Sequence, residues 1–275
     1  MNSEQTNEII NEIKQRTSKE AFSLTIIPDS QPGIFDSKFG GVPYWNPSMP
    51  YPTDESGEKL MLLAQINLSQ LEKNKLLPDI GMLQFYIAPN DMYGVDFDEP
   101  DKQNTFRVIY HKTINSSVTK EDILQLEPPV STDADIETPI WKECALEIKK
   151  TYTYMSVFDY RFDKLFGEIA HEKFQTEEMS AYNILDEDAY NDMFDEPSTA
   201  GHWILGYPYF TQSDPREYNE DYCYYDTLLF QMDSDYINKE DYILWGDCGV
   251  ANFFINHKDL ENKDFSKILY NWDCC

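Results

Sequence analysis

The pattern of apolar and polar positions predicts core strands in two parts of the chain that resemble each other. Residues 62–67 read LLAQIN, and residues 228–233 read LLFQMD. A second matched pair follows, GMLQFYI at 81–87 and GVANFFI at 249–255. Short apolar runs bounded by turn-forming residues are typical of buried strands. The two offsets, 228 − 62 = 166 and 249 − 81 = 168, are nearly equal, as in a duplicated unit with small loop changes.

Further helices and strands are predicted around these blocks. Isoleucines at helical spacing predict an amphipathic helix over residues 3–20. Aromatic spacing predicts helix over residues 158–194, interrupted near Gln175, and apolar positions predict a closing helix over residues 258–270. The remaining strands are expected at 21–27, 105–112 and 144–153.

The fold class follows from how these elements are ordered. Pro and Gly punctuate residues 28–57 so densely that neither helix nor continuous sheet is expected there. Strands and helices mix without regular βαβ alternation. We therefore expect an α+β fold, internally duplicated, with largely antiparallel sheets, peripheral helices and long Pro/Gly-rich loops. Residues 1–275 are expected to be one domain with two repeats, a first half at 1–127 and a second half at 140–275, joined by a connecting segment at 128–139.

Composition adds a strong negative charge to this picture. The 275 residues carry 50 acidic and 22 basic side chains, a formal net charge of −28. Such a surface repels nucleic-acid phosphates and anionic lipid headgroups, which argues against binding to either. It attracts a basic protein or divalent cations, or it simply keeps the protein soluble, and solubility is the favoured explanation.

The cysteines and the first residues predict a cytoplasmic protein. The five cysteines are scattered and odd in number, without the paired spacing of a metal site, so we expect reduced thiols. The polar opening at residues 1–5 predicts that there is no secretory signal, and no apolar run has membrane-spanning length. We expect neither a cofactor nor a bound metal.

Polar side chains recur on one face of the two matched strands. Period two places Gln65 beside Asn67, and Gln231 beside Asp233. Buried groups of this kind must be hydrogen-bonded, since an unsatisfied one costs roughly 1–3 kcal/mol. The favoured interpretation is that the amides bridge to the Pro-rich loops. The alternative is that the two pairs meet near a pseudo-two-fold axis and line a ligand site.

Residues 245–249, WGDCG, combine an aromatic ring, two glycines and a carboxylate. As structure, the glycines turn the chain into the next strand and Asp247 caps the turn. As function, Trp245 is a candidate for ligand contact, and Asp247 with Asp233 and Asp235 could supply oxygen ligands to a hard divalent ion. The spacing of these carboxylates matches no calcium loop, so the structural interpretation is favoured.

No catalytic signature stands out in the sequence. A thiolate–imidazole pair of Cys248 with His202 or His257 lacks a diagnostic spacing, and a buried structural cysteine is the favoured interpretation. Nucleophile-elbow, phosphate-cradling and zinc motifs are absent from the sequence.

A Tyr-rich acidic segment at residues 214–226 offers a different kind of site. It places Tyr218 and Tyr222 among carboxylates. The aromatic rings would supply contact area and therefore affinity, and the carboxylates would raise the association rate and orient the partner. This combination suits an interface with a cationic partner. In an equally weighted interpretation, the tyrosines cover the core and the carboxylates are solvated. Trp45, in the Pro-rich loop, is a further aromatic candidate for binding.

Several of these blocks together resemble a known family. They are KFGGVP at 38–43, LAQI at 63–66, GMLQF at 81–85, LGYP at 205–208, LFQMDSD at 229–235 and WGD at 245–247. On these blocks the chain resembles, over nearly its whole length, the YwqG-like family of bacterial proteins of unknown function. The resemblance implies no activity, cofactor or catalytic residue. It implies a role near bacterial toxin systems, as an immunity protein.

Charge, aromatic segment and resemblance lead to one expected function. We expect a cytosolic, non-enzymatic binding protein that engages a basic protein partner through its acidic and aromatic loops. The alternative is a small-molecule-binding or hydrolytic enzyme with its site between the two halves, where pockets often form. A purely structural protein would leave no trace in the sequence.

Overall fold

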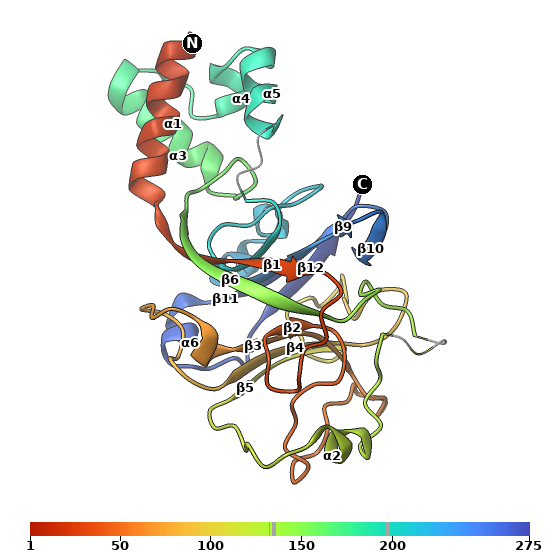
Figure 1. Ribbon diagram of the computed structural model, residues 1–275. Coiled ribbons are helices and arrows are strands. Elements are labelled where there is room, and N and C mark those ends of the chain that lie inside the picture. The colour runs from red at the N-terminus through yellow and green to blue at the C-terminus, as the bar shows by residue number, and fades with distance from the viewer. Residues whose placement is uncertain (132, 134–135, 196–198) are drawn as a thin grey trace.

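The computed structural model is built on a curled sheet of ten strands, in which every neighbouring pair is antiparallel (Figure 1). It describes residues 1–131, 133, 136–195 and 199–275. The strand order is β12-β11-β8-β7-β1-β6-β2-β3-β4-β5. The strands are β1 (Lys19–Ile27), β2 (Lys38–Phe39), β3 (Met61–Asn67), β4 (Met82–Ile87), β5 (Phe106–His111), β6 (Cys144–Thr153), β7 (His202–Leu205), β8 (Thr227–Asp233), β11 (Val250–Ile255) and β12 (Leu269–Asp273). A separate hairpin pairs β9 (Asp235–Ile237) with β10 (Glu240–Ile243).

The helices lie at the periphery of this sheet, most of them beyond one end of β1 and β6 (Figure 1). They are α1 (Ser3–Thr17), α2 (Lys120–Leu124), α3 (Phe162–Phe174), α4 (Ala181–Ile184), α5 (Glu187–Asp195) and α6 (His257–Glu261), with short 3₁₀ helices η1 (Leu68–Gln70), η2 (Pro215–Glu217) and η3 (Glu220–Tyr224). The α+β class and the largely antiparallel sheet are thus confirmed. No helix within the described parts of the chain combines the length and the apolar character needed to cross a membrane.

We call α1, α3, α4 and α5, which lie beyond one end of β1 and β6, the helical layer (Figure 1). Helix α1 shows how this layer is assembled. A capping box starts the helix, because Asn2 Oδ1 accepts from the Gln5 backbone N–H and Gln5 Oε1 accepts from the Asn2 N–H. Ile9 and Ile13, four residues apart, are buried and belong to the same apolar cluster as Phe166 of α3. The amphipathic stripe read from the sequence therefore docks α1 against α3.

The strand order interlocks the two halves of the chain. β1, from the first half, pairs with both β6 and β7 of the second half, while β6 also pairs with β2 of the first half. Counted outward from the β1–β6 junction, β2-β3-β4-β5 on one side correspond in order to β7-β8-β11-β12 on the other. Neither half therefore has all its strand partners within itself.

Aromatic side chains from the two halves share one core. The ring centroid of Phe85 in β4 lies 4.5 Å from that of Phe230 in β8 and 5.2 Å from that of Phe253 in β11. The ring centroid of Phe106 in β5 likewise lies 5.1 Å from that of Tyr270 in β12. All five rings are at most 1% exposed. The curl of the sheet thus packs its two ends against each other through aromatic pairs.

The expected helix over residues 258–270 is wrong. Helix α6 ends at Glu261, Lys263 has a left-handed backbone with φ of 59°, and residues 269–273 form β12. Ile268, Leu269 and Tyr270 are all fully buried. A strand buried on both faces accommodates such a run, whereas periodicity alone does not separate it from a helix.

Most other predicted elements are confirmed within a few residues. The helix expected over 158–194 is interrupted where predicted, because Gln175 caps α3 in the left-handed conformation. The first helix is shorter than expected, ending at Thr17 before β1 begins at Lys19. The connecting segment at 128–139 lies in part outside the described residues.

Candidate functional site

Gln65 and Gln231 lie inside the protein and bridge strands to loops. Gln65 Nε2 donates to the carbonyls of Ile34 and Asp36, each at 2.9 Å, and its Oε1 accepts from the Tyr44 N–H at 2.8 Å. Neither glutamine side chain is exposed. Both amide hydrogens of Gln65 therefore hold the Pro-rich loop against β3, as the favoured interpretation expected.

Gln231 makes the matching set of contacts in the second half. Its Nε2 donates to the carbonyls of Thr199 and Gly201, each at 2.8 Å, and its Oε1 accepts from the Tyr209 N–H at 2.8 Å. The offsets of the loop partners, 199 − 34, 201 − 36 and 209 − 44, are all 165. Each amide thus holds a loop against a core strand through the same three hydrogen bonds.

Asp233 and Asp235 are engaged by neighbours. Asp233 Oδ2 accepts from the Gly201 N–H at 2.7 Å and Oδ1 from the Ser234 N–H at 2.8 Å, while burial raises the pKa of this carboxyl. His202 Nδ1 accepts from the Asp233 N–H at 3.0 Å, so the neutral ring donates from Nε2 to Asp235 Oδ2 at 3.3 Å. Both nitrogens of His202 are therefore occupied.

The suggested oxygen-ligand site is not formed. Asp247 is exposed, whereas Asp233 and Asp235 turn their oxygens to the backbone and to His202. Among the residues that the structure describes, no three His, Cys, Asp or Glu side chains are grouped so that they could hold a metal ion.

The aromatic candidates divide between core and surface. Trp45 is 2% exposed and donates from Nε1 to the Met49 carbonyl, and Trp245 is fully buried. Tyr222 is half-buried against the cluster that contains Phe210. Tyr218 is 74% exposed. The nine residues proposed from the sequence therefore do not converge on one site.

The interpretation of Cys248 as a buried structural cysteine is wrong. Cys248 is exposed in the turn before β11, and it is Cys144 in β6 that is buried. Cys248 belongs to the exposed turn of residues 246–248, and the buried positions begin only at Gly249, just before β11.

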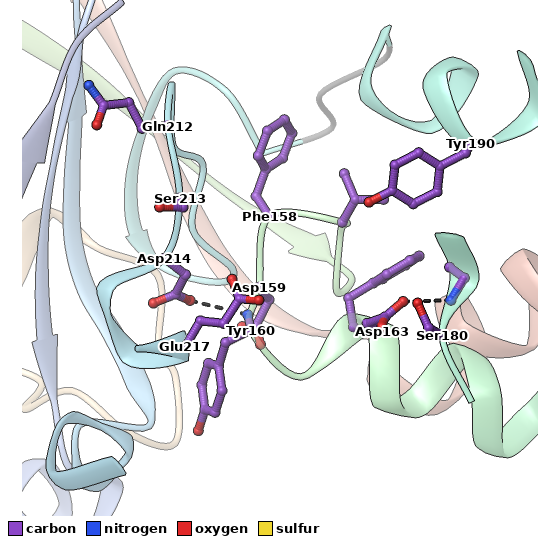
Figure 2. Close-up of a pocket in the computed structure, with 13 residues that line it drawn as sticks. Phe158, Asp159, Tyr160, Asp163, Ser180, Tyr190, Gln212, Ser213, Asp214 and Glu217 are labelled. Carbon is purple, nitrogen blue, oxygen red and sulfur yellow. Dashed lines mark hydrogen bonds between the residues drawn. The ribbon is translucent and has the colours of Figure 1, made fainter. Parts of the chain in front are cut away.

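A cavity of about 220 Å³ lies between the helical layer and the second half of the sheet (Figure 2). Four segments of the chain form it: the loop after β6 together with the start of α3, the start of α4, Tyr190 of α5, and the loop that ends in η2. The described residues lining it are Val157, Phe158, Asp159, Tyr160, Phe162, Asp163, Ser180, Ala181, Tyr190, Gln212, Ser213, Asp214 and Glu217. We call this cavity the acidic pocket.

Two of the lining residues, Asp159 and Asp214, are buried aspartates that pair with arginines. Asp159 accepts from Arg161 Nε at 2.7 Å and from Nη2 at 2.6 Å. Asp214 accepts from Arg216 Nε at 2.8 Å and from Nη2 at 2.6 Å, and also from the Tyr160 N–H at 3.2 Å. Burial would raise the pKa of Asp159, but the hydrogen bonds from Arg161 and the charge of Arg216 outweigh it and lower that pKa.

The rim of the pocket carries carboxylates of a different kind. Asp163 and Glu217 are exposed, and neither forms an ion pair within the described parts of the chain. Asp163 Oδ1 accepts from the Ala181 N–H at 2.6 Å. Burial raises the pKa of Tyr190, and the negative charges of Asp163 and Glu217 raise it further, so both carboxylates act on one ring. The figure places Asp163 and Glu217 on opposite sides of the pocket (Figure 2).

The charge and the size of the pocket suit a cationic group. None of the described lining residues is Lys or Arg, so the charge of the lining is negative. The volume of about 220 Å³ is below the roughly 300–1,000 Å³ of pockets for drug-sized ligands. An ammonium or guanidinium group at the end of one side chain fits both the charge and the size.

The candidate segment at residues 214–226 includes Asp214 and Glu217 of this pocket, but the other lining residues were not predicted, although one signal was available. The chain has four arginines, and two of them follow an aspartate by two residues, in Asp159-Tyr160-Arg161 and Asp214-Pro215-Arg216. The two triplets could have indicated a pair of two-armed ion pairs. That they meet at one cavity depends on tertiary contacts between the helical layer and the loop after β7.

Comparisons with known proteins give a family without a function. No curated protein matches the chain. The model of a domain of unknown function, DUF1963, matches residues 37–274, which is most of the sequence. The chain therefore belongs to the DUF1963 family.

Proposed function

We propose that this chain is a non-enzymatic binding protein that engages a basic protein partner, whose Lys or Arg side chain enters the acidic pocket. The observation that carries this proposal is the lining of the pocket, in which Asp163 and Glu217 face a small cavity without a neighbouring cation among the described lining residues. A cationic side chain would supply the missing charge, and a charge-assisted hydrogen bond to carboxylate is about twice as strong as a neutral one.

The surface around the pocket supports a protein rather than a free amine as the ligand. Glu217 is followed by Tyr218, which is 74% exposed, and the same segment continues through Glu220 and Asp221, which are also exposed. An exposed tyrosine beside a charged pocket is typical of an interface anchor. The net charge of −28 would steer a basic partner towards the protein and make the association sensitive to salt.

The buried ion pairs give the pocket a rigid base. Because Arg161 and Arg216 satisfy Asp159 and Asp214, these carboxylates would not have to be desolvated again when a partner binds. The partner would then interact with the rim, where Asp163 and Glu217 still carry free charge. The resemblance to YwqG-like proteins, and an immunity-like role against a basic toxin, remain part of this proposal.

The sequence-based alternative, an enzyme with a site between the halves, is supported by one feature. An open hollow of about 440 Å³ is lined from both halves, by Asp101, Lys102, Gln103, Asn104, Asp221, Tyr224, Tyr225, Ser266 and Lys267. Tyr225 Oη donates to Asp101 Oδ2 at 3.0 Å across this junction. The described lining holds no His or Cys, so a small polar ligand is better supported than a hydrolytic reaction.

We further propose that the two halves arose by duplication. The matched contacts of Gln65 and Gln231 support this, and so do two irregularities in the sheet. Leu63 in β3 and Leu229 in β8 are each an extra residue in a bulge, and they are 229 − 63 = 166 residues apart. Bulges are retained as defined features rather than scattered at random.

The binding proposal is tested by capture from native cell lysate with three immobilised proteins. These are the wild type, the pocket variant Asp163→Asn/Glu217→Gln, and the control Glu55→Gln/Glu58→Gln, which removes the same charge from an exposed loop of the first half. One basic protein bound in stoichiometric amount by the wild type and the control, but not by the pocket variant, is expected. Equal capture by all three would contradict the assignment to the pocket.

A further inference from the structure

Three cysteines gather where β12 ends beside the turn at residues 245–249. Cys248 and Cys275 are exposed, and Cys274 is partly exposed. β11 and β12 are antiparallel, with Val250 opposite Asp273. The pairing ends at Val250 and Asp273, and Cys248 lies in a turn that is closed by a hydrogen bond from the Gly249 N–H to the Trp245 carbonyl at 2.7 Å.

The two chains stay close beyond the last paired residues. Gly249 leaves no room for a side chain, because a Cβ there would overlap the carbonyl oxygen of Asp273. A disulfide joins cysteines whose Cα atoms are about 4.4–6.8 Å apart, so its two cysteines must lie on directly neighbouring segments such as these. The thiols of Cys248 and Cys275 interact, because the Cys248 side chain is the largest cause of the raised pKa of Cys275.

Cys274 points away from this pair. Side chains alternate along an extended chain, so Cys274 shares a face with Trp272 and not with Cys275. A Cβ on Gly246 would lie 2.8 Å from Cys274 Sγ and 3.5 Å from a ring carbon of Trp272, which places both on the Gly246 side. Only one of the two adjacent cysteines is therefore aimed at Cys248.

We propose that Cys248 and Cys275 form a reversible dithiol–disulfide pair that exchanges with a low-molecular-weight disulfide such as oxidised glutathione. In the first step the Cys248 thiolate attacks the small disulfide, forms a mixed disulfide and releases one small thiolate. In the second step the Cys275 thiolate displaces the second small thiolate. Two protein thiols are oxidised, one small disulfide is reduced to two thiols, and these take up the two protons.

The surroundings of the pair control how fast it reacts. The pKa of Cys275 is raised to about 11, first by its interaction with Cys248, then by partial loss of water around the thiol and by the negative charge of Asp247. Since the thiolate is the nucleophile, exchange is expected to be slow at neutral pH and faster at alkaline pH. Cys144 does not compete, because burial raises its pKa to about 12 and closes access.

The disulfide would fix a segment that reaches the acidic pocket. Asp273 accepts from the Gln212 N–H at 2.9 Å, and Gln212 Nε2 donates to the Cys274 carbonyl at 2.6 Å. Gln212 in turn lines the pocket. Any effect on binding rests on the proposed function, whereas the disulfide itself is tested without a partner.

The test treats the reduced, purified chain with oxidised glutathione at mildly alkaline pH. Free thiols are then alkylated, and the linkages are identified by non-reducing peptide mapping with mass spectrometry. The Cys248–Cys275 disulfide is expected to exceed every other linkage at least about tenfold, because thiols already in contact react at high effective concentration. Reduction with dithiothreitol should reverse it.

Two variants keep the result decisive. Cys274→Ser should form the internal disulfide as the wild type does, and Cys248→Ser should carry only a mixed disulfide with glutathione at Cys275. Both changes lie at partly or fully exposed positions, so folding is expected to be retained. A wild type that yields only mixed disulfides, or equal amounts of Cys248–Cys274 and Cys248–Cys275, would overturn the proposal.

Discussion

Arg216 and Asp214 form a two-armed ion pair inside the protein, with Nε 2.8 Å from Oδ1 and Nη2 2.6 Å from Oδ2. Arg216 is 1% exposed and Asp214 is 3% exposed. Arg216 Nη2 is also 3.8 Å from Asp159 Oδ2, so the guanidinium lies between both aspartates of the pocket. The base of the acidic pocket is therefore one charged cluster rather than two separate pairs.

Removing one partner of this pair should destabilise the protein strongly. Arg216→Met leaves Asp214 buried without its counter-ion, which typically costs about 3–5 kcal/mol. Urea unfolding followed by circular dichroism measures the change. Arg16→Met, which breaks an exposed pair with Glu172, is the control and should shift the midpoint far less. A midpoint for Arg216→Met equal to that of the wild type would show that the pair contributes nothing net.

The matched glutamines should be equally important to stability. Gln65→Ala and Gln231→Ala each leave a backbone N–H and two carbonyls of a loop without partners, at a cost of about 1–3 kcal/mol for each unsatisfied group. Gln125→Ala, at an exposed position, should change the free energy of unfolding by no more than about 0.5 kcal/mol. A large loss in one variant and none in the other would contradict the structural equivalence.

His111 should make stability depend on pH. Burial lowers its pKa from 6.5 to about 4, and Nε2 bonds to Gln84 Oε1 at 2.9 Å. The unfolded chain binds a proton at this residue below pH 6.5, whereas the folded chain does so only near pH 4. The contribution of the neutral ring to stability is therefore complete above pH 6.5 and is lost as the pH falls from 6.5 towards 4.

The variant His111→Gln tests this dependence, since glutamine can still donate to Gln84. Its urea midpoint should vary less with pH than that of the wild type across the same window. His171→Gln, at an exposed position, is the control and should follow the wild type. Parallel curves for the wild type and His111→Gln would mean that another group causes the loss.

The interlocked strands predict that the halves do not fold alone. β1 needs β6 and β7 as partners, and β2 needs β6, so residues 1–127 and 140–275 each lack strands that complete their sheet. Expressed separately, each should lack a cooperative thermal transition. Co-expressed, they should elute together in size-exclusion chromatography and regain that transition. Cooperative melting of either half alone would contradict the interlocked arrangement.

The positions of the strands were largely predictable, because the signal for a strand is local, whereas the pairing between the halves was not predicted. Both matched blocks, at 62–67 and 228–233, lie in core strands, and the Pro-rich loop is held by Gln65 as expected. The end of the chain was not predictable in the same way. The apolar run at 268–270 suits either a helix or a strand, and only pairing with β11 decides between them.

That residues so far apart in the chain share one pocket was beyond prediction for a physical reason. Its rim carboxylates, Asp163 and Glu217, are 54 residues apart in the chain, 217 − 163 = 54, and no periodicity connects them. They face one cavity only because α3 packs beside the loop that ends in η2. Trp45 and Trp245 were predicted as candidate binding residues, but both are buried. Large aromatic side chains that look like binding residues in a sequence are more often buried.

The acidic pocket is tested most directly by calorimetric titration of the captured basic partner, at low and at moderate salt. The wild type and Glu55→Gln/Glu58→Gln should bind it with the same Kd. Asp163→Asn/Glu217→Gln should bind at least about tenfold more weakly, which corresponds to about 1.4 kcal/mol. Binding by the wild type should weaken as salt rises. Equal Kd values for the pocket variant and its charge-matched control would contradict the account, because only the net charge, and not the pocket, would then attract the partner.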